Sequence, residues 1–170
     1  MPDAPCPGLT PLERWSLRPL TTRAILLGAL LAACSSPVEP GLSDDDELVL
    51  TVVPDLDPDD LPDDHATITS ARVAGRTLFL TVQYGGGCET HRLGLFAGTE
   101  LGESLPPYAL LRLAHDSGGD PCDALLSREV AVDLSPIVPL VQQSGGTALR
   151  FNLLEPGGQV SAVGELLLTF

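Results

Sequence analysis

The sequence has no lysine and few aromatic residues, and both shortages narrow the classes of function. All nine basic residues are arginines, they face 23 acidic residues, and the formal net charge of the 170-residue chain is −14. Such a chain lacks the basic surface that nucleic acids and anionic membrane headgroups require, so we expect no nucleic-acid partner. Aromatic residues make up 4% of the chain, too few for a surface on which bases stack.

The sequence also lacks an N-terminal apolar run long enough to cross a bilayer as a helix. The apolar run at residues 24–33 would rise only about 15 Å as a helix. It follows three basic residues, Arg14, Arg18 and Arg23. A basic start followed by a short apolar core is typical of a secretory signal peptide.

This apolar run ends in Leu31-Ala32-Ala33-Cys34, which resembles the lipobox of bacterial lipoproteins. The resemblance implies cleavage before Cys34, so that residues 1–33 are the signal peptide and a lipid on Cys34 holds the chain to a membrane. The residue directly after Cys34 is Ser35 and not an aspartate. In lipoproteins of this kind, that residue favours the outer membrane if the cell is Gram-negative. We therefore expect a lipid-anchored protein of the cell envelope. The alternative is an ordinary secretory signal peptide with a cysteine at that position by chance.

Two acidic segments follow the signal peptide. Residues 34–47 contain little to bury and end in the run Asp44–Glu47, so we predict a disordered tether that holds the domain away from the membrane. Residues 55–64 place carboxylates at alternate positions, as a calcium-binding loop does. However, Asp60 stands where that motif needs a glycine, and Ala66 where it needs the closing glutamate. We predict a solvated loop here, and weak calcium binding is the alternative.

The pattern of residues 48–170 predicts an all-β domain. Apolar side chains alternate with others from Leu78 to Tyr84, which gives a strand one apolar face. Similar short runs recur between glycine, proline and aspartate turns. They lie at residues 48–53, 67–74, 77–84, 91–96, 108–115, 128–134, 149–153 and 165–170. We predict a single antiparallel β-sandwich of about seven to eight short strands, with a short helical turn or irregular crossover at residues 135–140.

Two glycine-rich segments, residues 84–91 and 115–122, each follow a strand-like run and each contain one cysteine and one histidine. We expect the two segments to meet. Cys88 and Cys122 are the only cysteines in residues 48–170, and an exported chain meets oxidising conditions, so they are predicted to form a disulfide. In the chain-entropy model this crosslink stabilises the fold by roughly 4 kcal/mol.

A metal site is the alternative use of these side chains. Cys88, His91, His115 and Cys122 together would supply two thiolates and two imidazoles, which zinc and copper prefer. The six residues between His115 and Cys122 exceed the usual zinc-finger spacing. A disulfide and a metal cannot use the same two sulfurs, so the two hypotheses exclude each other in any one redox state.

Catalysis is the least supported hypothesis. A Cys88–His91 nucleophile pair would need a free thiolate, which Cys122 could quench. No serine stands in a nucleophile-elbow pattern. Asp116, Asp120 and Asp123 could hold a hard cation, but their spacing among serine, glycine and proline is typical of turns. We therefore expect no enzyme activity and no required cofactor, with a hydrolase of unknown substrate as a lesser alternative.

Three short segments carry a family resemblance: residues 84–91, residues 115–122, and Asp133-Leu-Ser-Pro-Ile137. Together they resemble uncharacterised bacterial lipoproteins, and the nearest named group is the C-terminal β-sandwich of NigD-like lipoproteins. The resemblance covers about residues 69–137. It implies a β-sandwich of the cell envelope and brings no known reaction with it. Our leading hypothesis is a non-catalytic binding or structural module with a possible envelope protein as its partner.

Overall fold

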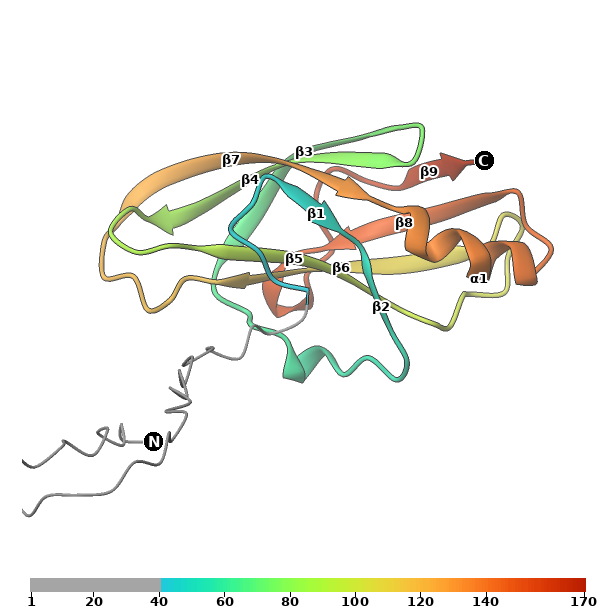
Figure 1. The fold of residues 1–170 in the computed structure, drawn as a ribbon, viewed down its shortest axis with the longest axis horizontal. Helices are drawn as coiled ribbons and strands as arrows, with labels where there is room; N and C mark the ends of the chain where they lie inside the picture. Colours follow the sequence, from blue (N-terminus) through green and yellow to red (C-terminus); the bar gives the residue numbers. More distant parts are fainter. Residues whose placement is uncertain (1–40) are drawn as a thin grey trace, which may run out of the picture. The chain divides into compact units, whose positions relative to one another are not determined.

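The computed structural model describes residues 41–170, which form two mixed β-sheets in a sandwich-like arrangement (Figure 1). The predicted signal peptide and Cys34 lie outside the described residues. One sheet has the strand order β1-β7-β4-β3 and the other β2-β5-β6-β8-β9. The strands are β1 (Glu47–Val49), β2 (Thr51–Val53), β3 (Ala66–Ala74), β4 (Thr77–Gly86), β5 (Arg92–Gly98), β6 (Tyr108–Asp116), β7 (Ala124–Asp133), β8 (Ala148–Leu154) and β9 (Leu166–Thr169).

Short helices join several of these strands. The chain forms single 3-10 turns at η1 (Pro58–Asp60), η2 (Ser135–Ile137) and η3 (Pro156–Gly158). The six-residue helix α1 (Val138–Gln143) follows η2 directly, which confirms the helical turn predicted near residues 135–140. No helix in the described range is long and apolar enough to cross a membrane.

The all-β prediction is confirmed, but the sheets are not purely antiparallel. The pairs β1–β7, β2–β5 and β6–β8 are parallel. The pair β6–β8 shows why: the chain leaves β6, passes through β7 in the other sheet, and returns through α1 to β8. A strand that returns by way of the opposite sheet arrives in the direction of the strand it left, so β6 and β8 run parallel.

The predicted strand at residues 48–53 is two strands in different sheets. Glu47–Val49 pairs with β7, whereas Thr51–Val53 pairs with β5. Leu50 lies between them, 1% exposed, and its N–H donates to the carbonyl of Asp133 at 3.0 Å. This segment therefore crosses from one sheet to the other across the edge of the core.

The core is mainly aliphatic, as the low aromatic content requires. Alternate residues of β4, such as Leu78, Leu80 and Val82, are buried to 2% exposure or less, which confirms the predicted apolar face of that strand. Phe151 is the largest fully buried side chain. A smaller second cluster packs Leu42 against Phe96 and Ala114.

The described part of the predicted tether, residues 41–47, packs on the domain. Leu42 is 8% exposed, and Ser43 exchanges backbone hydrogen bonds of 2.8 and 2.7 Å with Leu93. Asp46 forms an ion pair with Arg128, with 2.9 Å between Oδ1 and Nε. The packed part of the chain thus begins before the predicted boundary at residue 48, because Leu42 packs against Phe96 and Ala114.

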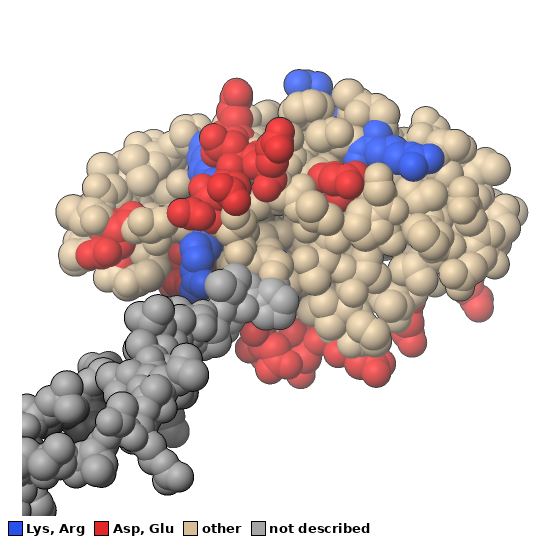
Figure 2. Space-filling view, viewed as in Figure 1, with Lys and Arg blue, Asp and Glu red and all other residues tan. Residues whose placement is uncertain are grey.

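The acidic loop at residues 55–64 is mostly exposed and contains η1. Asp57 caps this turn, because its Oδ1 accepts a hydrogen bond of 3.0 Å from the N–H of Asp59. Across the described residues, no three carboxylates of this loop come close enough to share a cation. Figure 2 shows acidic side chains at the lower margin of the view, where this loop lies in Figure 1.

Candidate functional site

The two glycine-rich segments meet at one end of the sandwich, as their sequence predicts. The first, residues 84–91, joins β4 to β5, and the second, residues 115–122, leads from β6 to β7. Because β4 pairs antiparallel with β7 and β5 with β6, both connections lie at the same end. Cys88 and Cys122 are joined by a disulfide across 34 residues, with 5.8 Å between their Cα atoms. We call these two segments the paired loops.

Asp120 is the centre of the paired loops. Its Oδ2 accepts hydrogen bonds from three consecutive backbone N–H groups, those of Gly87, Cys88 and Glu89, at 2.8, 2.8 and 2.9 Å. Its Oδ1 accepts a fourth from the N–H of Cys122 at 2.8 Å. The side chain is 1% exposed. These backbone donors, that of Glu89 first, hold the pKa of Asp120 well below its usual range. The first loop is therefore an anion-binding nest that the chain fills with its own carboxylate.

A chain of hydrogen bonds extends from Asp120 through both histidines. His91 Nε2 lies 3.0 Å from Asp120 Oδ2, and His91 Nδ1 lies 2.8 Å from His115 Nε2. His115 Nδ1 lies 3.1 Å from the backbone carbonyl oxygen of Asp64. Both histidines are buried, at 5% and 1% exposure. The ring of Tyr84 packs on both imidazoles, with centroid distances of 4.7 and 4.8 Å.

This geometry sets the number of ring protons. A carbonyl oxygen only accepts, so His115 donates from Nδ1 and presents a lone pair at Nε2. If each ring carried one proton, His91 could donate to only one of its two partners. Its other ring nitrogen would then direct a lone pair at the His115 Nε2 lone pair or at the Asp120 carboxylate. All three contacts are satisfied when the pair holds one additional proton. Burial, and after it the neighbouring charge of His91, lower the pKa of His115.

Two further carboxylates fix the second loop. Asp64 Oδ2 accepts from the backbone N–H and the hydroxyl of Ser117, at 2.7 and 2.6 Å. Asp116 pairs with Arg92 and accepts from the N–H of Gly118 at 2.9 Å. The pKa of Asp64 is lowered chiefly by the Ser117 hydroxyl, and that of Asp116 chiefly by the Gly118 N–H. Both carboxylates therefore stabilise the loop in their ionised forms.

The first loop requires glycine at Gly86 and at Gly87, which both have a positive φ, and Gly86 is also held by a close contact. Gly86 has φ of +153°, and a Cβ atom there would overlap Nε2 and Cε1 of the His91 ring. The absence of a side chain lets the imidazole lie directly against the backbone. The adjacent Gly85 has no such constraint, because a Cβ at that position would meet nothing within 4 Å.

The structure brings together the four residues of the sequence-predicted metal set, but as two separate pairs. The sulfurs of Cys88 and Cys122 are bonded to each other, and His91 is hydrogen-bonded to His115. Within residues 41–170, the one group of three or more ligating atoms within 4.8 Å of one another consists of Cys88, Asp120 and Cys122. The four-ligand set is thus not assembled in this oxidised state. The sequence interpretation missed the role of Asp120, although the three successive glycines at 85–87 signal a loop that can turn several N–H groups toward one acceptor.

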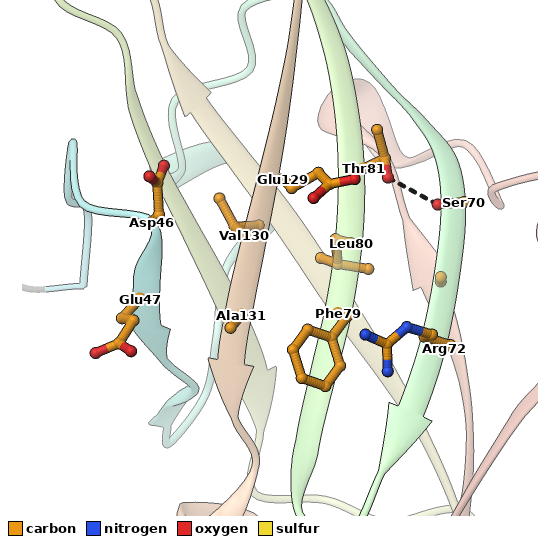
Figure 3. A pocket seen from close by; sticks show the side chains of 11 residues that line it. Asp46, Glu47, Ser70, Arg72, Phe79, Leu80, Thr81, Glu129, Val130 and Ala131 are labelled. Atoms are coloured by element: carbon orange, nitrogen blue, oxygen red, sulfur yellow. Dashed lines mark hydrogen bonds between the residues drawn. The ribbon is translucent and has the colours of Figure 1, made fainter.

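A second feature, which the sequence did not predict, lies on the outer face of the sheet β1-β7-β4-β3. We call it the outer groove, a hollow of about 420 Å³. Its lining comes from all four strands and from Asp46 just before β1, as Figure 3 shows. The strand register places Glu47, Ala131, Phe79 and Arg72 in one row across the sheet. The small Ala131 side chain thus lies between a carboxylate and an aromatic ring, and this difference in size makes the hollow.

No protein-family model and no curated protein matches this chain. Solved structures do match. A protein of unknown function (DUF1344) from Bacteroides vulgatus has a TM-score of 0.50 at 13% identity, and the match covers 73% of this chain and 56% of that one. A NigD-like immunity protein from Bacteroides caccae has a TM-score of 0.46 at 19% identity, covering 69% and 58%. A candidate lipoprotein from Bacteroides fragilis has a TM-score of 0.49 at 16% identity, covering 71% and 70%.

The match spans less than two thirds of the length of the first two of these proteins. At these identities the likeness concerns the fold and not the function. At the level of the fold, the predicted resemblance to uncharacterised bacterial proteins is confirmed by the Bacteroides vulgatus structure.

Proposed function

We propose that this chain is a lipid-anchored protein of the bacterial cell envelope whose domain is a non-catalytic binding or structural module. The disulfide between Cys88 and Cys122 is the observation that carries the proposal, because structural disulfides persist in oxidising compartments outside the cytoplasm. The lipobox-like sequence ending in Cys34 supplies the route to such a compartment. Ser35 after the cysteine favours the outer membrane in a Gram-negative cell.

The state of the paired loops supports a non-catalytic role. A general base must reach the proton of a substrate, but His91 and His115 are buried and every ring nitrogen already has a partner. A cysteine nucleophile needs a free thiolate, whereas both sulfurs of the loops are bonded to each other. The side chains with the most reactive chemistry are thus engaged in holding two connections together.

The experiment that tests the proposal is cell fractionation of a Cys34→Ala variant of the full chain. The wild-type chain is expected in the membrane fraction after a salt wash, and its intact mass should show a lipid and a disulfide. The Cys34→Ala variant should leave the washed membrane fraction. Cys6→Ala is the matched control, since Cys6 lies in the segment that is removed, and it should fractionate like the wild type. A Cys34→Ala chain that stays membrane-bound after the wash would contradict the lipid anchor.

A further inference from the structure

The outer groove combines an apolar floor with carboxylates that have no internal counterion. Asp46 is paired with Arg128. The guanidinium of Arg72 lies 3.8 Å from the centre of the Phe79 ring. By contrast, neither Glu47 nor Glu129 forms an ion pair within the part of the chain that the structure describes.

These two carboxylates border the hollow on two sides. The register places Glu47 beside Ala131 in β7 and Glu129 beside Thr81 in β4. Figure 3 shows the carboxylates of Asp46 and Glu47 on the β1 side of Ala131, and Phe79 with Arg72 on the other side. Figure 2 shows that acidic side chains gather on this face, over the region where β1 and β7 lie in Figure 1. A flexible side chain with an apolar stem and a cationic head matches such a surface.

Beside the hollow, the part of β7 before Ala131 has an edge with which no described strand pairs, with Asp44 and Asp46 in contact only with the Arg128 side chain there. β1 pairs with β7 only from Ala131 to Asp133, and no other described strand pairs with β7 on that side. The N–H of Ala131 points to this side, where it donates to the carbonyl of Asp46 at 2.8 Å. Because backbone groups alternate along a strand, the N–H groups of Ser127 and Glu129 point the same way. An extended peptide can pair with such an edge.

The charge of the chain identifies the kind of partner. Residues 41–170 contain six arginines, no lysine and twenty acidic residues. A second copy would bring a like-charged surface to the groove, which disfavours self-association there. A basic segment would bring the opposite charge.

We propose that the outer groove binds an extended, lysine- or arginine-containing segment of another protein. The segment adds a short strand beside Ser127 and Glu129, and one of its basic side chains lies over Ala131 between Glu47 and Glu129. This inference deepens the proposed function, on which it rests, by naming the surface and the chemistry of the partner. It is tested by binding, whereas the membrane anchor is tested by fractionation, so that either can fail alone.

The experiment titrates the full chain, purified in detergent, against a short fluorescent peptide in which valine and lysine alternate. A peptide with glutamine for every lysine is the neutral reference. At low ionic strength the lysine peptide should bind the wild type, and the Glu47→Gln/Glu129→Gln variant should bind it about tenfold more weakly. Ala131→Leu, which fills the hollow, should also weaken binding. Glu100→Gln/Glu103→Gln removes the same charge from a loop after β5, and this matched control should stay within about twofold of the wild type.

Four outcomes would overturn the proposal. Equal losses in both double variants would show that only net charge attracts the peptide. Equally tight binding of the glutamine peptide would show that the positive charge of lysine does not contribute to binding. A free diamine that competes as tightly as the peptide would make the ligand a small amine. A lysine peptide N-methylated at alternate residues keeps its charge but loses strand pairing, so it should bind more weakly, and unchanged binding would refute the added strand.

Discussion

Removing the disulfide should destabilise the domain mainly through the unfolded chain. Cys88 and Cys122 are 34 residues apart, and the chain-entropy model gives about 4 kcal/mol for a loop of that length. With an unfolding entropy of about 2.1 cal/mol/K per residue over residues 41–170, this corresponds to a fall in Tm of about 14 °C. The native state should change little, because the hydrogen bonds of Asp120 and the histidine pair use no sulfur atom.

The assay is denaturant and thermal unfolding of the Cys88→Ser/Cys122→Ser variant against the wild type. Adding a reductant should lower the stability of the wild type to that of the variant and leave the variant unchanged. A loss below about 1 kcal/mol would show that the unfolded chain gains little freedom, which contradicts the chain-entropy model. A loss accompanied by changed NMR signals of His91 and His115 would show instead that the disulfide positions the paired loops in the native state.

Three further predictions concern the same loops. Gly86→Ala should destabilise the domain by about 1–3 kcal/mol in urea unfolding because its Cβ overlaps His91, whereas Gly85→Ala should cost under about 1 kcal/mol; similar losses would refute the steric argument. Asp120→Ala should lower Tm, and added formate should partly restore it by entering the vacated nest; the wild type and Asp123→Ala should not respond. The lowered pKa of Asp120 means that its stabilising contribution is present above the unfolded-state value of about 3.9 and is lost as pH falls through the folded-state value. Stability of the wild type should thus decline below about pH 4 more steeply than that of Asp120→Ala, and parallel declines would contradict this assignment.

The sequence predicted that the two glycine-rich loops meet, but it did not predict that Asp120 holds them together. Cys88 and Cys122 could be paired because they are the only cysteines of the domain, and two loops that follow strands of a sandwich can lie at the same end. Asp120 could not be distinguished from a turn residue, because an aspartate beside glycine and proline has that role in many loops. Three of its four backbone N–H donors come from a segment about 30 residues away, and no local pattern shows such a contact.

The direction of each strand and the strand it pairs with could not be predicted from the sequence either. Alternation of apolar residues marks a strand and its buried face, but it carries no information on whether a neighbour runs parallel. The run at residues 48–53 has the pattern of one strand, and only the positions of β7 and β5 divide it at Leu50. The outer groove depends on the register of four strands, which places Ala131 between larger neighbours, so it could not be predicted from any one of them.

The division at Leu50 has a mechanical consequence. The first strands of the domain bind one sheet through β1 and the other through β2, and Ser43 is already paired with Leu93. A pull on the chain at residue 41 would therefore load both sheets together rather than peel one strand from an edge. For a domain held by its N-terminus to a moving surface, this arrangement would resist stepwise unravelling from the point of attachment.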